Sequence, residues 1–421
     1  YDLDATTIKV ASPYGGGIYV EVPFLASAGV VNVDVTGAVR SPYFSAKSFH
    51  ATTLSEWINT ERNHPAPWAD FQTDKFMMQV PTNWIYALPD PVTLMANWDS
   101  AMDAMNDLMG FPRIRGKETE YPQVDVIMRS SVHAPGYPSV NNTDNPNNDR
   151  GGNHGNYLVQ GPQTGWSTEF HEQGHAYFFP KFGGESESTV NLLHVAIWNR
   201  KFGYNLDYSF AGSFSFENNP HRTLDNTAVT WMTVFNFSPR EVPMASGEKS
   251  YQLKGHAKFV DIAGLFGWEG LDAFWYAFNL DEENGIPYST DTDSMLLRLC
   301  QGVGEDIRPL LHFWGIHPDD PTTLASAVAA EGLTPPVEIY DRLVHYKSLV
   351  PADNAAFRTF AQNWWNKVPS IGGYWTEREH ARQWDTTALY GEGDQQRSEA
   401  TNPGEIYNEN SASDIEARVQ E

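Results

Sequence analysis

The stretch Glu169-Phe170-His171-Glu172-Gln173-Gly174-His175 decides how this 421-residue sequence is interpreted, together with Glu187 further along the chain. It contains the pattern His-Glu-x-x-His. Because residues four apart share one face of a helix, His171 and His175 can point two imidazole nitrogens at one metal ion. Glu172 lies close enough to accept a proton from a water beside the metal, but it is not aligned with the histidines as a ligand. The stretch therefore predicts a helix that carries a metal site.

The flanking residues predict where this helix begins and ends. The Ser-Thr pair at 167–168 can cap its start, and the helix is expected to continue through aromatic residues and stop near Pro180. The Gly-Gly pair at 183–184 turns the chain, and a second helical pattern starts near Ser186. Glu187 then falls in the first turn of the second helix, where it can face back toward the first.

Two histidines on one helix and a glutamate on the next form the ligand arrangement of the gluzincin class of zinc peptidases. The competing motif with a third histidine in the same run is absent, because Phe178 and Lys181 occupy those positions. The five-residue pattern arises by chance in about one chain in a hundred of this length. A surface helix with incidental histidines is therefore the alternative, and the position of Glu187 argues against it.

Composition limits the partners of the protein. The chain has 28 basic and 53 acidic residues, a net charge of −25, which argues against binding nucleic acid or anionic lipid. The hydrophobic content of 41% suffices for a core, and the length predicts two or three structural units. The 14 Trp and 19 Tyr residues suit stacking on sugar rings or clamping of an extended peptide, although core packing is the better explanation of any single one.

The single cysteine and the apolar segments bear on cellular location. Cys300 lies in an apolar helical run and is expected to be buried, and one cysteine permits no disulfide within the chain. No apolar stretch approaches the length that spans a membrane. We expect a secreted or cell-surface monomer, with Tyr1 as the start of a mature or trimmed chain that shows no signal peptide.

The predicted fold class is α+β. We expect a β-rich N-terminal subdomain (1–66), a zinc peptidase catalytic core (67–240), a helical C-terminal subdomain (241–370) and a polar acidic tail (371–421). Strands are predicted at 7–10, 18–22, 30–35, 76–81, 124–128 and 153–160, the last as a strand that could pair with substrate. Helices are predicted at 91–109, with a buried Met stripe, and at 249–280, 291–314, 321–331, 336–348 and 352–367. The segments 12–17 and 140–149 are expected to be a turn and a solvated loop.

The sequence resembles the enhancin-like zinc peptidases, the M-sixty family that includes viral enhancins and bacterial mucin-active proteases and O-glycopeptidases. The resemblance rests on His171-Glu172-Gln173-Gly174-His175 and on Glu187-Ser188-Thr189-Val190-Asn191. Supporting similarities are Ser12–Tyr19, Ala66–Phe71 and Phe313–Ile316, so the resemblance covers roughly residues 8 to 320. The run Ala176-Tyr177-Phe178-Phe179 is apolar, where the family often has polar residues.

The resemblance implies that His171, His175 and Glu187 bind Zn²⁺ and that Glu172 is the general base. It also implies secretion and a glycoprotein substrate, in particular mucin-type O-glycosylated peptides.

Other side chains are candidates for binding the substrate. Tyr157 and Arg222 are candidates for stabilising an oxyanion, and Trp166, Asn153, His154 and Arg222 for lining a sugar subsite. Two alternatives remain open, a secreted zinc protease without glycan dependence and a glycan-binding module with a structural zinc.

Overall fold

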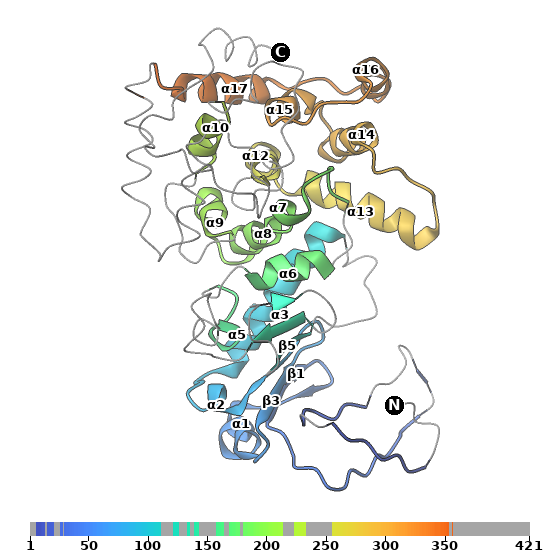
Figure 1. Ribbon diagram of the computed structural model, residues 1–421, viewed down its shortest axis with the longest axis vertical. Coiled ribbons are helices and arrows are strands. Elements are labelled where there is room, and N and C mark those ends of the chain that lie inside the picture. The colour runs from blue at the N-terminus through green and yellow to red at the C-terminus, as the bar shows by residue number, and fades with distance from the viewer. Residues whose placement is uncertain are drawn as a thin grey trace, which may run out of the picture. The chain divides into compact units, whose positions relative to one another are not determined.

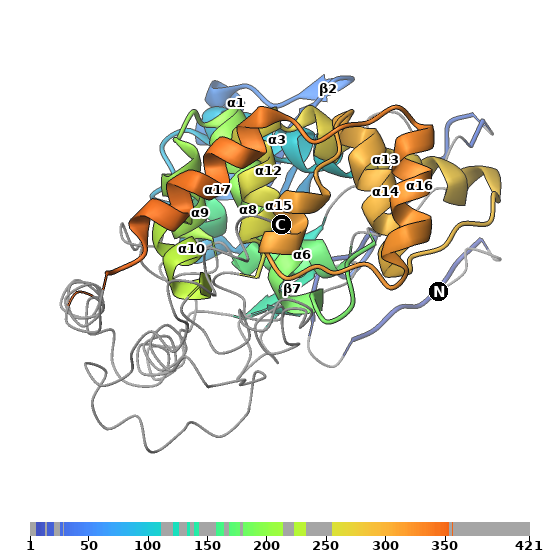
Figure 2. The same ribbon diagram turned by 90° about the horizontal axis from the view of Figure 1, so that it is seen from above.

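The computed structural model describes residues 6–12, 15–20, 26–27, 29–110, 121–125, 133–134, 139–142, 157–163, 168–176, 180–213, 223–232, 255–352 and 356. The chain forms two compact units (Figures 1 and 2). The first comprises Tyr1–Met102 with Gly116–Gly165, and the second Asp103–Arg115 with Trp166–Glu421. The first contains a mixed sheet and the second is helical where it is described, which confirms the α+β class. None of the described helices is both long and apolar enough to cross a lipid bilayer.

The sheet of the first unit has the strand order β2-β1-β3-β4-β5-β7-β6 within the described residues. Its strands are β1 (Tyr43–Lys47), β2 (His50–Ala51), β3 (Trp68–Gln72), β4 (Met77–Pro81), β5 (Pro122–Asp125), β6 (His133–Ala134) and β7 (Ser139–Asn142). The pairs β1–β3, β4–β5 and β5–β7 are parallel, and the others are antiparallel. Because β1 pairs with β3, the sheet continues across residue 66, where a subdomain boundary was expected.

Two strand predictions in this unit are confirmed and two segments differ. β4 lies within the predicted strand 76–81, and β5 begins two residues before the predicted strand 124–128 and overlaps it at residues 124 and 125, with 126–128 outside the described residues. The segment 140–149 was expected to be a loop, but its beginning is strand β7. The predicted strand 153–160 is wrong where the structure describes it, because Tyr157–Gln160 forms the short helix α5.

The early valine-rich segments do not form the expected strands. The described parts of 7–10, 18–22 and 30–35 have no strand pairing, and Val30 and Val31 expose 91% and 69% of their surface. β-Branched residues favour a strand only where a neighbouring strand pairs with it and its side chains are partly buried. At the expected turn 12–17, the N–H of Gly15 donates to the carbonyl of Ser12 at 3.2 Å, and residues 13 and 14 lie outside the described residues. Tyr19, just beyond it, donates its hydroxyl to Asp70 on β3, so two segments that carry the family resemblance are in contact.

Aromatic and methionine side chains form the core of the first unit. Helix α1 (Leu54–Asn59) begins with a capping box and places Trp57 against Phe44 and Phe71, with ring centroids 5.7 and 5.2 Å away. Helix α2 (Thr82–Ile85) follows β4, and helix α3 spans Pro91–Met109, as predicted. The predicted apolar stripe of α3 is buried along its whole length; its members are Leu94, Met95, Trp98, Met102, Met105 and Leu108.

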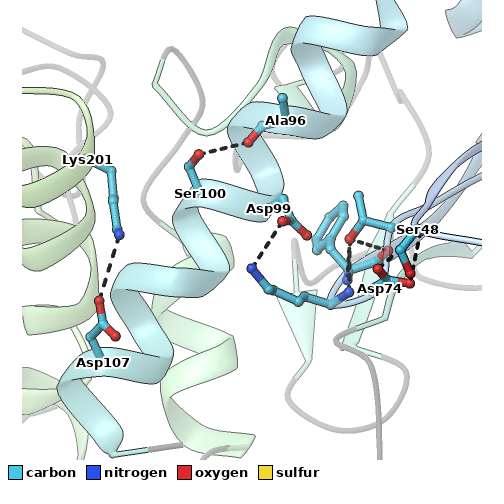
Figure 3. A network of polar contacts seen from close by, with 10 residues as sticks. Ser48, Asp74, Ala96, Asp99, Ser100, Asp107 and Lys201 are labelled. Carbon is cyan, nitrogen blue, oxygen red and sulfur yellow. Dashed lines mark hydrogen bonds and ion pairs between the residues drawn. The ribbon is translucent and has the colours of Figure 1, made fainter. Parts of the chain in front are cut away.

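Helix α3 is fixed by ion pairs along its length (Figure 3). Lys75 Nζ lies 3.2 Å from Asp99 Oδ2, and Lys201 Nζ lies 3.7 Å from Asp107 Oδ2. Ser100 instead donates to the carbonyl of Ala96 one turn earlier, at 2.9 Å. The first ion pair is internal to the first unit, and the second ion pair is internal to the second.

The second unit contains the following described helices, two of which are almost fully buried. They are α6 (Thr168–Ala176), α7 (Ser186–Thr189), α8 (Leu192–Lys201), α9 (Leu206–Gly212), α10 (Leu224–Met232), α12 (Ala257–Phe266), α13 (Glu269–Asn284), α14 (Thr292–Val303), α15 (Arg308–Phe313), α16 (Pro321–Ala330) and α17 (Val337–Leu349). Residues 192–198 of α8 and 257–263 of α12 are buried without a break. These two helices form the core against which the neighbouring helices pack.

Two predicted long helices are each divided in the structure. The helix expected over 249–280 is α12 and α13, separated at Gly267, and the helix expected over 291–314 is α14 and α15, separated at Gly304. Both glycines have φ +81°, a positive value that other residues adopt at a cost, and Gly304 has the left-handed conformation that commonly ends a helix. α16 and α17 match their predictions, and the helix expected at 352–367 falls almost entirely outside the described residues. Cys300 in α14 is buried, as expected, and burial raises the pKa of its thiol to about 11.

Candidate metal centre

Helices α6 and α7 of the second unit carry the predicted metal ligands. His171 and His175 lie one turn apart on α6, and Glu187 lies in the first turn of α7, as expected. A turn at Gly183-Gly184 precedes α7. Within the described residues, these three side chains form the one group of three or more His, Cys, Asp and Glu side chains whose ligand atoms lie close enough for a shared metal ion.

The ligand atoms form a nearly equilateral triangle. His171 Nε2 and His175 Nε2 are 3.2 Å apart, and Glu187 Oε2 lies 3.4 Å from the former and 3.5 Å from the latter. Tetrahedral zinc with bonds of 2.0–2.1 Å separates its ligand atoms by about 3.3–3.4 Å. The spacing therefore fits three corners of a zinc tetrahedron and leaves the fourth corner for another ligand.

Asn191 fixes the ring of His171. Its Oδ1 lies 2.8 Å from His171 Nδ1, and its Nδ2 donates to the carbonyl of Glu187 at 3.2 Å. An amide oxygen can only accept, so His171 carries a proton on Nδ1, and Nε2, which faces His175 and Glu187, is the nitrogen that can bind a metal. This residue orients one ligand and is bonded to the backbone of another, as outer partners of metal sites commonly are.

Gly174 allows α6 to approach the following helices closely. A Cβ atom at this position would lie 2.8 Å from Val190 Cβ and 3.1 Å from Leu193 Cδ1. Such distances are shorter than van der Waals contact. The absence of a side chain at Gly174 therefore lets the histidine helix approach the residues that follow Glu187.

The surroundings of the site shift the pKa values of three charged side chains in different directions. The hydrogen bonds that His171 and then His175 make to Glu187 hold the pKa of its carboxyl well below its usual value. Burial raises the pKa of the Glu169 carboxyl well above its usual value, and the neighbouring charge of Glu172 adds to this. Burial also lowers the pKa of Lys181 to about 8, against the opposing effect of Glu185 and Glu187. The low pKa of the Glu187 carboxyl suits a ligand of a cation.

The other predicted site residues have different outcomes. Glu172 is half-buried on α6, between the two histidines in sequence. Tyr157 starts α5, and the position of its side chain lies outside the described part of the structure. The residues Asn153, His154, Trp166 and Arg222 lie outside the described residues altogether, so their predicted roles stay predictions. His194 is buried with its ring 4.3 Å from that of Trp198 and is not part of the group.

Sequence reasoning missed several supporting residues. Asn191 stood in the quoted family run without a role, although its position four residues after Glu187 puts both on one helical face. Glu185 and Lys258, which form a buried ion pair beside α7, have no recognisable signal because they lie far apart in sequence.

Comparison with known proteins identifies the family. The profile described as "Peptidase M60, enhancin and enhancin-like" matches residues 37–315, and the chain belongs to this family. The expected resemblance is confirmed.

Curated relatives match only a part of the chain. A TRPM8 channel-associated factor homolog from Xenopus laevis is 32% identical over 139 residues, which are 33% of this chain and 15% of that protein. Human TRPM8 channel-associated factor 1 is 36% identical over 110 residues, 26% of this chain and 12% of that protein. This chain thus spans a small part of the length of these relatives.

A solved structure shares the fold. A functionally unknown conserved protein from Bacillus anthracis str. Ames superposes with a TM-score of 0.53 at 15% identity. The match covers 70% of this chain and 57% of that one. At this identity the similarity concerns the fold alone.

Proposed function

We propose that this chain is a zinc-dependent endopeptidase that cleaves glycoproteins, with mucin-type O-glycosylated peptides as its substrate class. The observation that carries the proposal is the triangle of His171, His175 and Glu187 at 3.2 to 3.5 Å, in a chain that belongs to a peptidase family. The glycan part of the proposal comes from the family resemblance. A secreted or cell-surface location belongs to the same proposal.

The residues of the chain have distinct roles in this reaction. His171, His175 and Glu187 would hold the ion, and Asn191 keeps His171 in the tautomer that binds it. A zinc ion held there would act as a Lewis acid, which lowers the pKa of a bound water and polarises a peptide carbonyl. Glu172 takes the proton of the attacking water and delivers it to the leaving amine. Tyr157 and Arg222 are the proposed partners of the developing oxyanion.

The exchange Glu172→Gln tests the catalytic role. It removes the base but none of the three ligands, so we expect peptide hydrolysis to fall by about 10² to 10⁴-fold. Zinc content, measured by metal analysis of the purified protein, should stay at the parent value. Parent-like turnover in this variant would refute the mechanism.

A paired digestion tests the substrate class. A mucin-type O-glycopeptide and the same peptide without its glycan are incubated with the parent chain, and the products are identified by mass spectrometry. We expect cleavage of the glycosylated form. Equal cleavage of both forms would instead support a zinc protease without glycan dependence.

The second candidate, a binding module with a structural zinc, is weaker at this site. Structural zinc sites have four protein ligands. Among the described residues, no fourth His, Cys, Asp or Glu joins the group. Retention of glycopeptide binding, with no cleavage by either the parent or the Glu172→Gln variant, would favour this candidate.

A further inference from the structure

A pair of opposite charges is buried in the second unit beside the metal centre. Glu185 and Lys258 expose 0% and 2% of their surface, and Lys258 Nζ lies 2.5 Å from Glu185 Oε1. Burial of two charges costs several kcal/mol per ion, which their attraction repays only in part unless the geometry is excellent. Apolar residues of similar volume are often equally stable in such a position. Stability alone is therefore a poor explanation for this pair.

Each partner of the ion pair is held in place by further contacts. Lys258 Nζ also donates to the carbonyl of Gly255 at 2.6 Å and lies 4.8 Å from the ring centre of Phe259. The second carboxylate oxygen of Glu185, Oε2, accepts from Thr189 Oγ1 at 3.1 Å. The two charges thus occupy one defined geometry.

The ion pair connects the start of α7 to α12. The carbonyl of Glu185 accepts the N–H groups of Ser188 and Thr189, both at 3.1 Å, and so begins α7. α7 has only four residues, and a helix this short is not stable by itself. Lys258 belongs to the buried first part of α12. The ion pair therefore anchors this helical turn to the core of the unit, beside the packing of its buried residues Ser188 and Thr189.

Glu187 lies in this anchored turn, two residues after Glu185. Its side chain is 36% exposed, so packing alone restrains it little. We propose that Glu185 and Lys258 are positioning residues of the metal centre, which fix α7 on α12 and so hold the Glu187 carboxylate 3.4 and 3.5 Å from the two histidine nitrogens. This inference rests on the proposed function, in that the three ligands must bind zinc.

Zinc affinity and stability, measured separately on the full chain, test the inference. K258M leaves Glu185 buried without its cation, and we expect it to lose both stability and zinc affinity. The double variant E185Q/K258M removes both charges at similar volume, and we expect it to recover stability. Its zinc affinity should stay roughly 10 to 100-fold below the parent, as for other outer-shell changes. Stability is followed by thermal unfolding of the apo protein, and affinity by competition for Zn²⁺ with a chromophoric chelator.

The two quantities separate a positioning role from a merely structural one. If E185Q/K258M recovers zinc affinity together with stability, the inference is overturned. Should the double variant not fold, T189V decides: it removes only the hydroxyl that donates to Glu185, and parent-like zinc affinity there would overturn the inference as well. A parent chain that binds no zinc would overturn the proposed function and this inference together.

Arg342→Met is the matched control. Arg342 Nε lies 3.4 Å from Oδ1 of Asp261, a buried carboxylate on the same helix α12, but Arg342 belongs to α17 and not to α7. We expect R342M to lower stability and leave zinc affinity at the parent value. An equal loss of zinc affinity in R342M would show that any destabilisation of α12 impairs the site, and would overturn a specific role for Glu185 and Lys258.

Discussion

His171 shows how a single side chain of this site is prepared for its role. It exposes only 3% of its surface, and its Nδ1 lies 2.8 Å from Asn191 Oδ1. The amide oxygen selects one tautomer and one ring orientation, so the ring is preorganised for metal binding. The motif predicts which residues are ligands, and Asn191 determines how one of them is presented.

Asn191→Ala should therefore weaken metal binding. Without the acceptor, His171 can rotate and change tautomer, and we expect zinc affinity to fall by about 10 to 100-fold. Chelator competition measures this loss. Asn199→Ala is the control, since Asn199 also lies in the α7–α8 region but bonds to Tyr204 and Trp268, away from the ligands. Equal affinity of N191A and the parent would contradict the role given to Asn191.

At the scale of elements, the close packing of α6 against the residues after α7 brings the ligands together. Glycine is a poor helix residue, less favourable than alanine by about 1 kcal/mol. Gly174 nevertheless lies inside α6, because a Cβ there would meet Val190 and Leu193 at 2.8 and 3.1 Å. Gly174 thus lowers the helix propensity of α6 but allows a close approach of the helices, which sets the distance between the histidines and Glu187.

Gly174→Ala tests this balance. The added methyl group overpacks the core, which costs about 1–3 kcal/mol. Alanine also improves helix propensity by about 1 kcal/mol, so over most of this range the cost is larger than the gain. We expect a net loss in the free energy of unfolding, measured with denaturant. Gly183→Ala serves as control, since nothing lies within 4 Å of a Cβ at that turn. A G174A variant as stable as the parent would show that the cost of overpacking does not exceed the gain in helix propensity.

The break between α14 and α15 is also decided by one glycine. Gly304 has φ +81° and open space around its Cα, so an added Cβ meets backbone strain and no neighbour. Gly304→Ala should lower the free energy of unfolding by about 1–2 kcal/mol, the usual cost of a left-handed conformation. Denaturant unfolding measures this loss, with Gly183→Ala as the control variant. An unchanged midpoint would mean that the loop can take another conformation.

At the scale of the whole molecule, stability depends on a buried carboxyl in the second unit. Asp261 on α12 accepts from Trp314 Nε1 at 2.9 Å and lies near Arg342 of α17. Burial raises its pKa from 3.8 to about 6, although Arg342 and the bond from Trp314 oppose the rise. Between these pH values the folded chain holds a proton that the unfolded chain releases. The contribution of Asp261 to the free energy of unfolding therefore falls as pH rises from about 4 to 6.

Asp261→Asn measures this pH dependence. Asparagine does not titrate, so the stability of the parent relative to D261N should fall by roughly 3 kcal/mol between about pH 4 and pH 7. Denaturant unfolding of both chains across this range gives the difference. A difference that stays constant with pH would show that Asp261 ionises at its ordinary pKa.

The sequence alone determined the features that depend only on residues close together in the chain. The stripe of α3 and the spacing of His171, His175 and Glu187 could be predicted because helical periodicity and motif spacing are properties of neighbouring residues. The valine-rich strands near the N-terminus and the two long C-terminal helices were predicted wrongly for the same reason. A strand depends on a distant partner, and one glycine can end a helical pattern that otherwise continues.

Only the tertiary structure decided which distant residues meet. The pairing of β1 with β3, the contact of Gly174 with Val190 and the ion pair of Glu185 with Lys258 all join segments that local pattern does not relate. The sequence predicted that three ligands exist. The distances of 3.4 and 3.5 Å from Glu187 to the two histidine nitrogens arise from helix packing, because packing fixes distances between helices and local pattern does not.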